Sequence, residues 1–447
     1  MVSRNFLTSD KSLSLRRRLL EGVAWSIAWR VPIQGSTLVI NLILANLLGS
    51  SMFGQYALIY TTVLTVSAVG TLGLGGSATK YIAEFRLVDK ERTGRILGLC
   101  SATSVITAWI TGIALFVCAP WIAEYIVNAP GLTLGLRIGS GVAVFVVLNG
   151  YAMSALAGLE SFPALGVGGI SGALVLVSSC AIGALLGGVN GATSGLMAGS
   201  FWQWAILAFL FRRERARHGL EMTYRGIEKE WQLVSKYFIP SALSGFVAAP
   251  VLWLGNVFLA WSADGLHQVA LYTAANNIRA CIIFLPQIVN GVAVSLINTQ
   301  VGLRSVSGYR RTFWLNLTFT ALPAVVGATG VMLLSGRLLA FFGKAFVEGR
   351  PALVALSLAA VAEALIMATY QVAQSRAEMW RSLFMIYIPT DITIVVLAYA
   401  FAPRYGAAGL AWAYALGCGV ALLTNIIVVY QLGLRPEKRT MLPSRTT

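Results

Sequence analysis

Four ionisable residues lie well inside long apolar stretches of this 447-residue chain, namely Arg30, Arg279, Glu363 and Asp391. A charge that faces lipid near the middle of a bilayer costs about 3 kcal/mol or more, so such residues usually face water, a ligand or an opposite charge. Two guanidinium groups would suit a phosphate-bearing ligand, because arginine presents a planar fork of donors to phosphate oxygens. The two carboxylates could pair with the arginines, bind a coupling proton or cation, or be buried in a neutral, hydrogen-bonded form.

Each arginine belongs to a stripe of polar side chains at helical spacing. The stripes are Arg30, Gln34, Thr37 and Asn41, and Tyr272, Asn276, Arg279, Pro286 and Asn290. A polar stripe on a membrane helix lines either a solvated cavity or a hydrogen-bonded seam with another helix, and we favour the cavity. The substrate-binding residues that we predict are therefore Arg30, Gln34, Asn41, Tyr272, Asn276 and Arg279.

The two arginines differ in their predicted depth. Arg279 lies about 16 Å into its segment, close to the middle of an apolar core about 30 Å thick. Arg30 lies about 12 Å into its own, so its long side chain could reach the membrane surface instead. The prediction of a cavity-lining role is therefore firmer for Arg279.

Signatures of enzymes and metal sites are missing from the sequence. It contains no D-x-D, no Walker A loop and no H-x-x-x-D, and its two histidines, His218 and His267, stand alone in connections. The five cysteines have neither pairwise nor metal-type spacing. They are Cys100, Cys118, Cys180, Cys281 and Cys418. We therefore predict no catalytic residue, no metal and no cofactor, and a protein that is not an enzyme.

The composition places the chain in a membrane. It is 57% hydrophobic and only 11% charged, and its mean hydropathy is +0.75, which leaves too little polar surface to cover a soluble globule. The net charge of +16 would suit nucleic acid only if the basic residues gathered on one soluble face, and they are spread over many connections. We predict contact with membrane lipids and none with nucleic acid.

Apolar runs of spanning length predict about twelve membrane helices. Those of the first half lie near 22–48, 54–79, 96–118, 132–157, 165–187 and 189–211. Those of the second half lie near 237–261, 268–297, 313–336, 351–375, 383–401 and 406–432. The charged stretch 212–236 separates them. This pattern predicts an N-terminal six-helix lobe at 1–211, a cytoplasmic hinge at 212–236, a C-terminal six-helix lobe at 237–432 and a cytoplasmic tail at 433–447.

Basic residues indicate how the chain lies across the membrane. Of the 33 Lys and Arg, Arg30 and Arg279 lie inside spans, and nearly all others lie on the side of the termini and the hinge. The opposite side holds only Arg137, Arg337, Lys344, Arg350 and Arg404. Because cytoplasmic connections collect Lys and Arg, we predict that both termini and the hinge are cytoplasmic.

The even number of spans in the first half requires the second half to enter the membrane from the same face, which predicts parallel repeats related by an axis along the membrane normal. The fold class that we predict is an all-α integral membrane protein with two parallel six-helix lobes around a central cavity. The two polar stripes can then face a common gap.

In the sixth span, Gly187, Gly191, Gly195 and Gly199 form G-x-x-x-G steps, a pattern that lets helix backbones approach closely.

Several short motifs resemble those of a known family. They are residues 48–56 (LGSSMFGQY), 73–75 (GLG), 77–83 (SATKYIA), 370–374 (YQVAQ) and 405–409 (YGAAG). They are similar to the polysaccharide-export branch of the multidrug/oligosaccharidyl-lipid/polysaccharide exporter superfamily, although Lys80 stands where arginine is usual. The resemblance implies a bacterial O-antigen or exopolysaccharide flippase. It also implies two lobes that open alternately to each side, and an undecaprenyl-pyrophosphate-linked sugar unit as cargo.

We therefore predict a flippase that moves a lipid-linked oligosaccharide from the cytoplasmic to the outer leaflet of the inner membrane, for O-antigen (lipopolysaccharide) or exopolysaccharide biosynthesis. A polysaccharide polymerase is a candidate partner, and Glu363 and Asp391 are candidates for coupling to a proton or cation. One alternative is a drug or organic-cation exporter of the same superfamily, although a cationic-drug pocket would favour acidic and aromatic groups over arginines. Another is a membrane-embedded glycosyltransferase, polymerase or acyltransferase.

Overall fold

The computed structural model describes residues 15–71, 74–231, 250–302, 305–376 and 379–433. Its N lobe contains α1 (Leu15–Thr71), α2 (Leu74–Phe85), α3 (Lys90–Trp121), the π-helix η1 (Ile122–Ile126), the 3-10 helix η2 (Pro130–Leu132), α4 (Thr133–Gly158) and α5 (Phe162–Arg217). The described part of its C lobe starts with a helix at Pro250–Ala260. It continues with α7 (Gly265–Gly302), α8 (Val306–Ala340), the 3-10 helix η3 (Lys344–Gly349), α9 (Arg350–Ser375), α10 (Met379–Ser382), the π-helix η4 (Leu383–Tyr387) and α11 (Ile388–Leu432).

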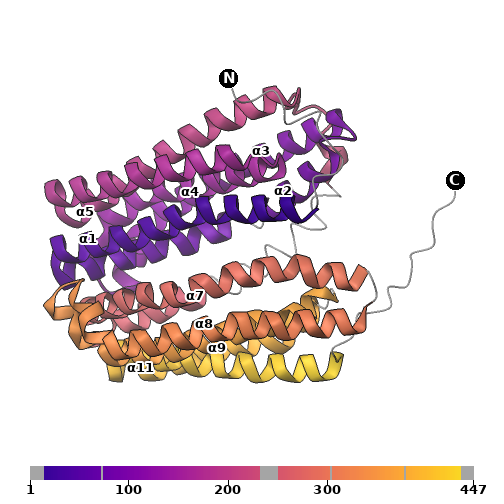
Figure 1. Cartoon of the computed structure of the whole chain (residues 1–447). Helices are drawn as coiled ribbons and strands as arrows, with labels where there is room; N and C mark the ends of the chain where they lie inside the picture. The colour runs from indigo at the N-terminus through magenta and orange to yellow at the C-terminus, as the bar shows by residue number, and fades with distance from the viewer. Residues whose placement is uncertain (1–14, 72–73, 232–249, 303–304, 377–378, 434–447) are drawn as a thin grey trace.

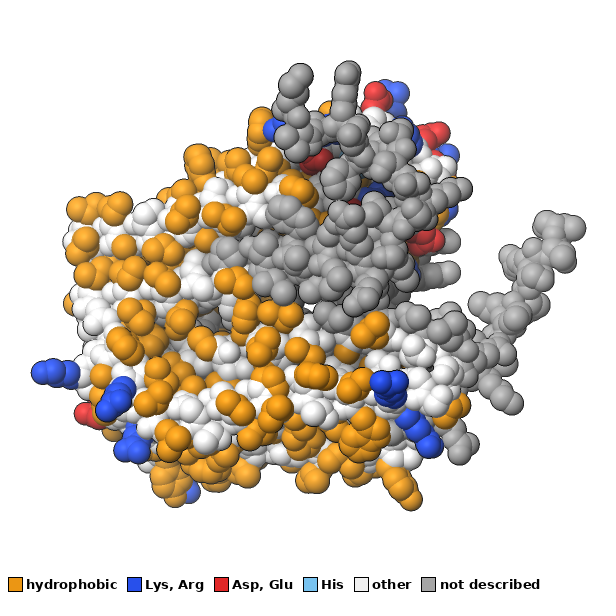
Figure 2. Space-filling view, in the orientation of Figure 1, with side chains coloured by type: hydrophobic (Ala, Val, Ile, Leu, Met, Phe, Trp, Pro, Cys, Tyr) orange, Lys and Arg blue, Asp and Glu red, His pale blue; other side chains and the backbone are white. Residues whose placement is uncertain are grey.

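The described residues form helices and no strand, and 8 helical stretches among them are long and apolar enough to cross a membrane. On the face shown in Figure 2, hydrophobic side chains cover the middle of the molecule and charged ones gather toward its two ends. Large apolar side chains of α3, including Trp109, Ile110, Ile113 and Val117, are more than half exposed. The predicted all-α membrane fold is confirmed.

Three of the long helices are long enough to supply two spans each, and each of them breaks at a glycine. Helix α5 has 56 residues and would extend about 84 Å if it were straight, far more than an apolar core of about 30 Å. Its backbone leaves the helical region at Gly187 and Gly188. The corresponding breaks are at Gly49 in α1 and Gly406 in α11, both with positive φ. Each break lies at or within a few residues of a boundary that the hydropathy pattern predicts.

Glycines allow the two arms of α5 to pack backbone to backbone. A Cβ atom added to Gly191 would lie 2.0 Å from the carbonyl oxygen of Gly183, and one added to Gly195 would lie 2.1 Å from that of Ser179. The Ser179 hydroxyl donates to the Gly195 carbonyl across the same contact at 2.8 Å. The close packing predicted from the G-x-x-x-G steps is confirmed, and α5 is a helical hairpin.

Two predicted spans differ from the helices that the structure describes. The predicted span 54–79 contains residues 72–73, which lie outside the described residues, and it is represented by the second part of α1 up to Thr71 and by α2 from Leu74. Of the predicted span 237–261, residues 237–249 lie outside the described residues, and only the helix at Pro250–Ala260 can be compared. In addition, α5 continues to Arg217, into the predicted hinge.

Figure 1 shows the N-lobe helices on one side of the molecule and the C-lobe helices on the other. One apolar core lies within the N lobe between α2, α3, α4 and α5, and smaller ones lie within the C lobe. The largest core contains residues of both lobes and therefore joins them. We call the end of the molecule that holds Gly49, Gly188 and Gly406 the kink end, and the opposite end, with residues 218–231, the linker end.

Candidate functional site

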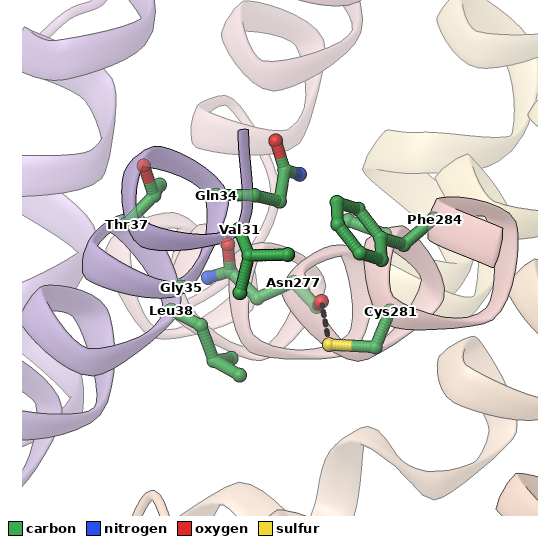
Figure 3. Close-up of a pocket in the computed structure, with 9 residues that line it drawn as sticks. Val31, Gln34, Gly35, Thr37, Leu38, Asn277, Cys281 and Phe284 are labelled. Carbon is green, nitrogen blue, oxygen red and sulfur yellow. Dashed lines mark hydrogen bonds between the residues drawn. The ribbon is translucent and has the colours of Figure 1, made fainter. Parts of the chain in front are cut away.

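The lobes meet where α1 lies against α7. The Asn41 side-chain amide donates to the Asn277 side-chain oxygen at 3.1 Å. Both α1 and α7 also contribute residues to the apolar core that the lobes share. A pocket of about 190 Å³ lies in this seam. Its lining, most of which is labelled in Figure 3, is Val31, Gln34, Gly35, Thr37, Leu38, Asn277, Ala280, Cys281 and Phe284.

The polar groups of this seam pocket are amides. Asn277 Oδ1 accepts from Asn41, but the buried Nδ2 of Asn277 has no hydrogen-bond partner among the described residues. The Gln34 side chain is exposed, and Figure 3 shows it beside the same space as Asn277 and Phe284. Amide N–H groups donate to hydroxyl or phosphate oxygens, and the remaining lining is largely apolar. The seam can therefore hold a ligand with both an oxygen-rich and an apolar part.

Arg279 points away from this seam, into the C lobe. Its Nη1 donates to both carboxylate oxygens of Glu363 on α9, and its Nε donates to Asn276 Oδ1 at 2.8 Å. The Tyr414 hydroxyl on α11 donates to the same carboxylate at 2.5 Å, and the guanidinium carbon lies 5.2 Å from the Tyr414 ring centroid. Side-chain exposure is only 11% for Arg279 and 12% for Glu363, so the pair is largely buried between three helices.

Helical geometry explains why the two polar groups of α7 separate. Successive residues on an α-helix are rotated by about 100°, so Asn276 and Arg279 share one face while Asn277 lies on another. Tyr272 is buried on the Arg279 face at 5% exposure. Further along α7, Asn290 accepts from Asn316 of α8 at 3.1 Å. The stripe predicted on α7 thus packs against helices of its own lobe, and the adjacent face of α7 meets α1.

The structure brings some predicted site residues together and leaves others apart. Gln34 and Asn41 lie at the α1–α7 seam, whereas Tyr272, Asn276 and Arg279 lie on the face of α7 that turns to Glu363. Arg30 belongs to α1, but its side chain lies outside the described residues.

The second carboxylate, Asp391, lies in the first turn of α11. Its buried Oδ2 has no hydrogen-bond partner among the described residues. Tyr387 precedes it by one helical turn, and the Tyr387 ring packs edge-on against Tyr370 of α9, with 5.8 Å between the centroids. Unlike Glu363, Asp391 is therefore a carboxylate without a cationic partner in the described part of the chain.

Two site residues are absent from the sequence-based set. Asn277 could have been suspected, because two consecutive asparagines in an apolar helix place an amide on two faces. Tyr414 has no such signal, since it is one of 15 tyrosines and its spacing from Glu363 indicates nothing. Among the described residues, no group of three or more His, Cys, Asp or Glu could hold a metal ion.

Comparison with known proteins identifies the family. Residues 19–297 match the family described as "Polysaccharide biosynthesis protein". The chain belongs to this polysaccharide biosynthesis family. The matched residues include nearly all of α1 and the seam-facing part of α7, so the family match covers the whole α1–α7 seam pocket. Glu363, Asp391 and Tyr414 lie beyond it.

A curated relative of this family member is the EPS I polysaccharide export inner membrane protein EpsE of Ralstonia solanacearum, 23% identical over 93% of this chain and 95% of the relative. An inward-facing multidrug resistance MATE transporter of the MOP superfamily is similar in structure, with a TM-score of 0.77, 17% identity and coverage of 91% and 98%. The lipid II flippase MurJ in an inward closed conformation has a TM-score of 0.74, 16% identity and coverage of 91% and 87%. This polysaccharide biosynthesis family member therefore has the MATE and MurJ fold and is a multi-pass membrane protein.

Proposed function

We propose that the protein is a flippase that moves a lipid-linked oligosaccharide, carried on a polyprenyl pyrophosphate, from the cytoplasmic to the outer leaflet by alternating access. It is a transporter rather than an enzyme, and it serves the synthesis of a cell-surface polysaccharide. The family match, a relative named for polysaccharide export and the fold shared with a lipid II flippase all support this function.

The observation that carries the proposal is the seam pocket between the lobes. A lipid-linked sugar needs donors for hydroxyl and phosphate oxygens next to an apolar surface for its lipid. The pocket offers both, because Gln34 and the Asn277 Nδ2, which has no partner among the described residues, lie among side chains such as Val31, Leu38 and Phe284. It also lies where two lobes meet, so a rearrangement of the lobes changes the contacts of whatever it holds.

The side chains of the seam pocket favour an oxygen-rich cargo over an organic cation. A cation exporter needs a carboxylate that is free to face the ligand, but Glu363 is held by Arg279 and Tyr414, and Asp391 does not line the seam pocket. The seam pocket itself is lined by no acidic residue in the described part of the chain. A drug exporter therefore lacks a specific observation in its favour.

We propose distinct roles for the predicted binding residues. Gln34 and Asn41 act at the seam with Asn277, and Arg30 extends the same face of α1. Tyr272, Asn276 and Arg279 form a second polar group that serves the cargo in another arrangement of the lobes, in which Arg279 exchanges Glu363 for pyrophosphate. Such an exchange gives the differential affinity between states that a transporter requires.

For energy coupling, we propose Asp391 as the proton- or cation-binding residue and Glu363 as the group that changes its partner. The observation behind this proposal is the buried carboxylate oxygen of Asp391 that has no partner among the described residues. We expect Asp391→Asn to leave protein abundance unchanged and to abolish the dependence of transport on an ion gradient. Gradient-dependent transport at the wild-type rate in this variant would contradict the coupling role.

We further propose an inner-membrane location with both termini cytoplasmic, and a polysaccharide polymerase as the protein that uses the translocated unit. The strong asymmetry of Lys and Arg between the two sides supports this orientation. The lobe boundaries near 1–211 and 237–432 and the hinge at 212–236 belong to the same proposal.

The decisive experiment measures translocation of a lipid-linked oligosaccharide across vesicles that contain the purified protein. We expect transport by the wild type and a loss of about tenfold in Asn277→Ala, the size expected when one buried donor is removed. Asn425→Ala is the matched control, because the Asn425 amide bonds the carbonyl of Ala421 on its own helix and no other group in the described part of the chain. A wild-type protein that moves no lipid-linked cargo would exclude the function. A fully active Asn277→Ala would remove the seam from the site.

A further inference from the structure

One of the motifs that resemble the export family, residues 48–56, lies at the kink end between the lobes. Gly49 breaks α1 there, so the second arm of α1 starts within the motif. A Cβ atom added to Gly54 would lie 1.8 Å from the carbonyl oxygen of Leu266 and 2.7 Å from its carbonyl carbon. Leu266 belongs to the first turn of α7 in the C lobe. The lobes therefore touch backbone to backbone at Gly54, and any other residue type would place a side-chain atom inside that contact.

A ring contact between the lobes stands beside this backbone contact. The Phe53 side chain is buried at 0% exposure, and its ring meets that of Phe346 edge-on, with 5.8 Å between the centroids. Phe346 belongs to η3 of the C lobe. On the other side, the Phe53 ring stacks on Tyr56 of the same motif, with 6.4 Å between the centroids. The motif thus contributes a glycine and a ring to the contact with the C lobe.

The second arm of α1 turns different faces to the two lobes. Val63 packs on α4 of its own lobe, because a Cβ atom added to Gly139 would lie 2.6 Å from Val63 Cγ2. At about 100° per residue, Val63 lies opposite Gly54, whereas Ala57 lies within about 60° of Gly54. Ala57 is 2% exposed and belongs to the apolar core that the lobes share. We therefore expect position 57 to be covered by the C lobe while the kink end is closed.

We propose that residues 48–56 are the N-lobe side of a gate at the kink end, and that Gly54 is the positioning residue that lets this gate close. A Cβ atom at Gly54 collides with backbone, which cannot rotate away as a side chain can, so it penalises the closed arrangement. When the lobes part, Leu266 moves away and the same Cβ atom meets no such obstacle. A change at Gly54 therefore shifts the balance between arrangements of the lobes, because its cost differs between them.

This inference rests on the proposed flippase function, to which it adds the closure of one end. Alternating access requires that one end be shut while the other receives the cargo. The contacts of Phe53 and Gly54 suit a closure that opens again, because neither involves a charged group. Opening therefore leaves no buried charge without its partner, which would be strongly destabilising.

Closure of the gate can be measured without any cargo. The reporter protein carries Ala57→Cys, keeps Cys100, which is 0% exposed in the N-lobe core, and has alanine at the other native cysteines. We expect N-ethylmaleimide to react slowly with both thiols. Gly54→Ala should raise the reaction rate at position 57 about tenfold, a common effect of overpacking one buried site, and should leave that of Cys100 unchanged. Mass spectrometry of the labelled peptides separates the two thiols.

Gly191→Ala is the matched control for a purely structural effect. A Cβ atom at Gly191 would lie 2.0 Å from the Gly183 carbonyl oxygen, a similarly tight backbone contact that lies within the N lobe. We expect this variant to lower the Tm without raising the reactivity at position 57. Gly336→Ala in α8, where a Cβ atom meets nothing within 4 Å, should change neither property.

Phe53→Leu tests the gate independently, because it removes the ring contact with Phe346 and adds no volume. It should raise the reactivity at position 57 about threefold, the factor that one aromatic pair contributes, and it decides the question if Gly54→Ala fails to fold. No increase in a folded Gly54→Ala or in Phe53→Leu would overturn the gate, and so would an equal increase in Gly191→Ala.

Transport tests what the gate does for the cargo. In the vesicle assay, Gly54→Ala should move the lipid-linked oligosaccharide about tenfold more slowly at unchanged protein abundance, because fewer molecules are closed at the kink end. Transport at the wild-type rate, with a raised reactivity at position 57, would overturn the role of Gly54 in transport. A wild type that moves no lipid-linked cargo would refute only the proposed function, since the thiol measurements need no cargo.

Discussion

At the scale of single residues, the site is organised by one buried ion pair and by the Asn277 side chain, whose Nδ2 has no hydrogen-bond partner among the described residues. Arg279 and Glu363 cancel each other's charge in a largely dry environment, and Tyr414 donates to the same carboxylate. An intact buried pair adds little to stability, because desolvation offsets the attraction, but a broken one is strongly destabilising. The pair is therefore better explained as a switchable contact than as a stabilising one.

This interpretation predicts how variants of the pair behave. Arg279→Ala should lower the free energy of unfolding by about 3–5 kcal/mol and reduce protein abundance, because Glu363 is left buried and unpaired. The double variant Arg279→Met with Glu363→Leu should recover the abundance, since no buried charge remains, but should not transport. Immunoblots of membranes and the vesicle assay measure the two properties. Full transport by the double variant would show that the pair has no part in the mechanism.

At the scale of elements, glycine breaks turn long apolar helices into hairpins. In α11, the break at Gly406 has φ 58° and ψ −142°, a region that is essentially restricted to glycine. Gln268 of α7 fixes this break, because its side-chain oxygen accepts from the Ala407 amide at 2.8 Å. The break thus orients the second arm of α11, which carries Tyr414 toward Glu363.

Gly406→Ala should therefore be destabilising for two reasons. A Cβ atom at this position would lie 2.3 Å from Gln268 Oε1, and the backbone conformation costs other residues about 1–3 kcal/mol. We expect the Tm in detergent to fall by a few degrees. Gly330→Ala in α8, where a Cβ meets nothing within 4 Å, should leave the Tm unchanged or raise it. Equal Tm values for the two variants would mean that the break at Gly406 is not needed for the fold.

At the scale of the whole molecule, hydrogen bonds join the lobes on the kink-end side. The Trp261 indole donates to the Ile126 carbonyl at 2.8 Å, and the Asn46 amide donates to the Phe341 carbonyl at 2.7 Å. Nearer the middle, the Trp253 indole donates to Thr62 Oγ1 at 2.9 Å. These contacts close the kink end in the described conformation, and a transporter that opens there must break them.

The two ends of the molecule should lie on opposite sides of the membrane. Gly219 follows α5 at the linker end, and Gly349 directly precedes α9 at the kink end. Because basic residues concentrate at the linker end, we expect a reporter fused at Gly219 to be cytoplasmic and one fused at Gly349 to be on the outer side. Alkaline phosphatase and fluorescent-protein fusions measure this. The same sidedness at both positions would rule out the orientation.

The sequence by itself determined the class of protein, most helix boundaries and the residues worth testing. Long apolar runs commit a segment to a membrane helix without reference to its neighbours, because the backbone must satisfy its hydrogen bonds within the helix. Glycine spacing in the sixth span likewise predicted the close packing in α5, because a residue without a side chain lets two helix backbones approach closely wherever they meet. Polar stripes on the first and eighth predicted spans drew attention to α1 and α7, the two helices that meet at the seam.

Only the tertiary structure decided which polar groups meet. Asn276 and Asn277 are adjacent in the sequence, yet one bonds Arg279 inside the C lobe and the other bonds Asn41 across the seam. That outcome depends on how α7 is rotated about its axis, and the rotation is set by packing against α1 and α9 together. The partnership of Arg279, Glu363 and Tyr414 joins residues from three helices, and no local pattern along one helix contains that information.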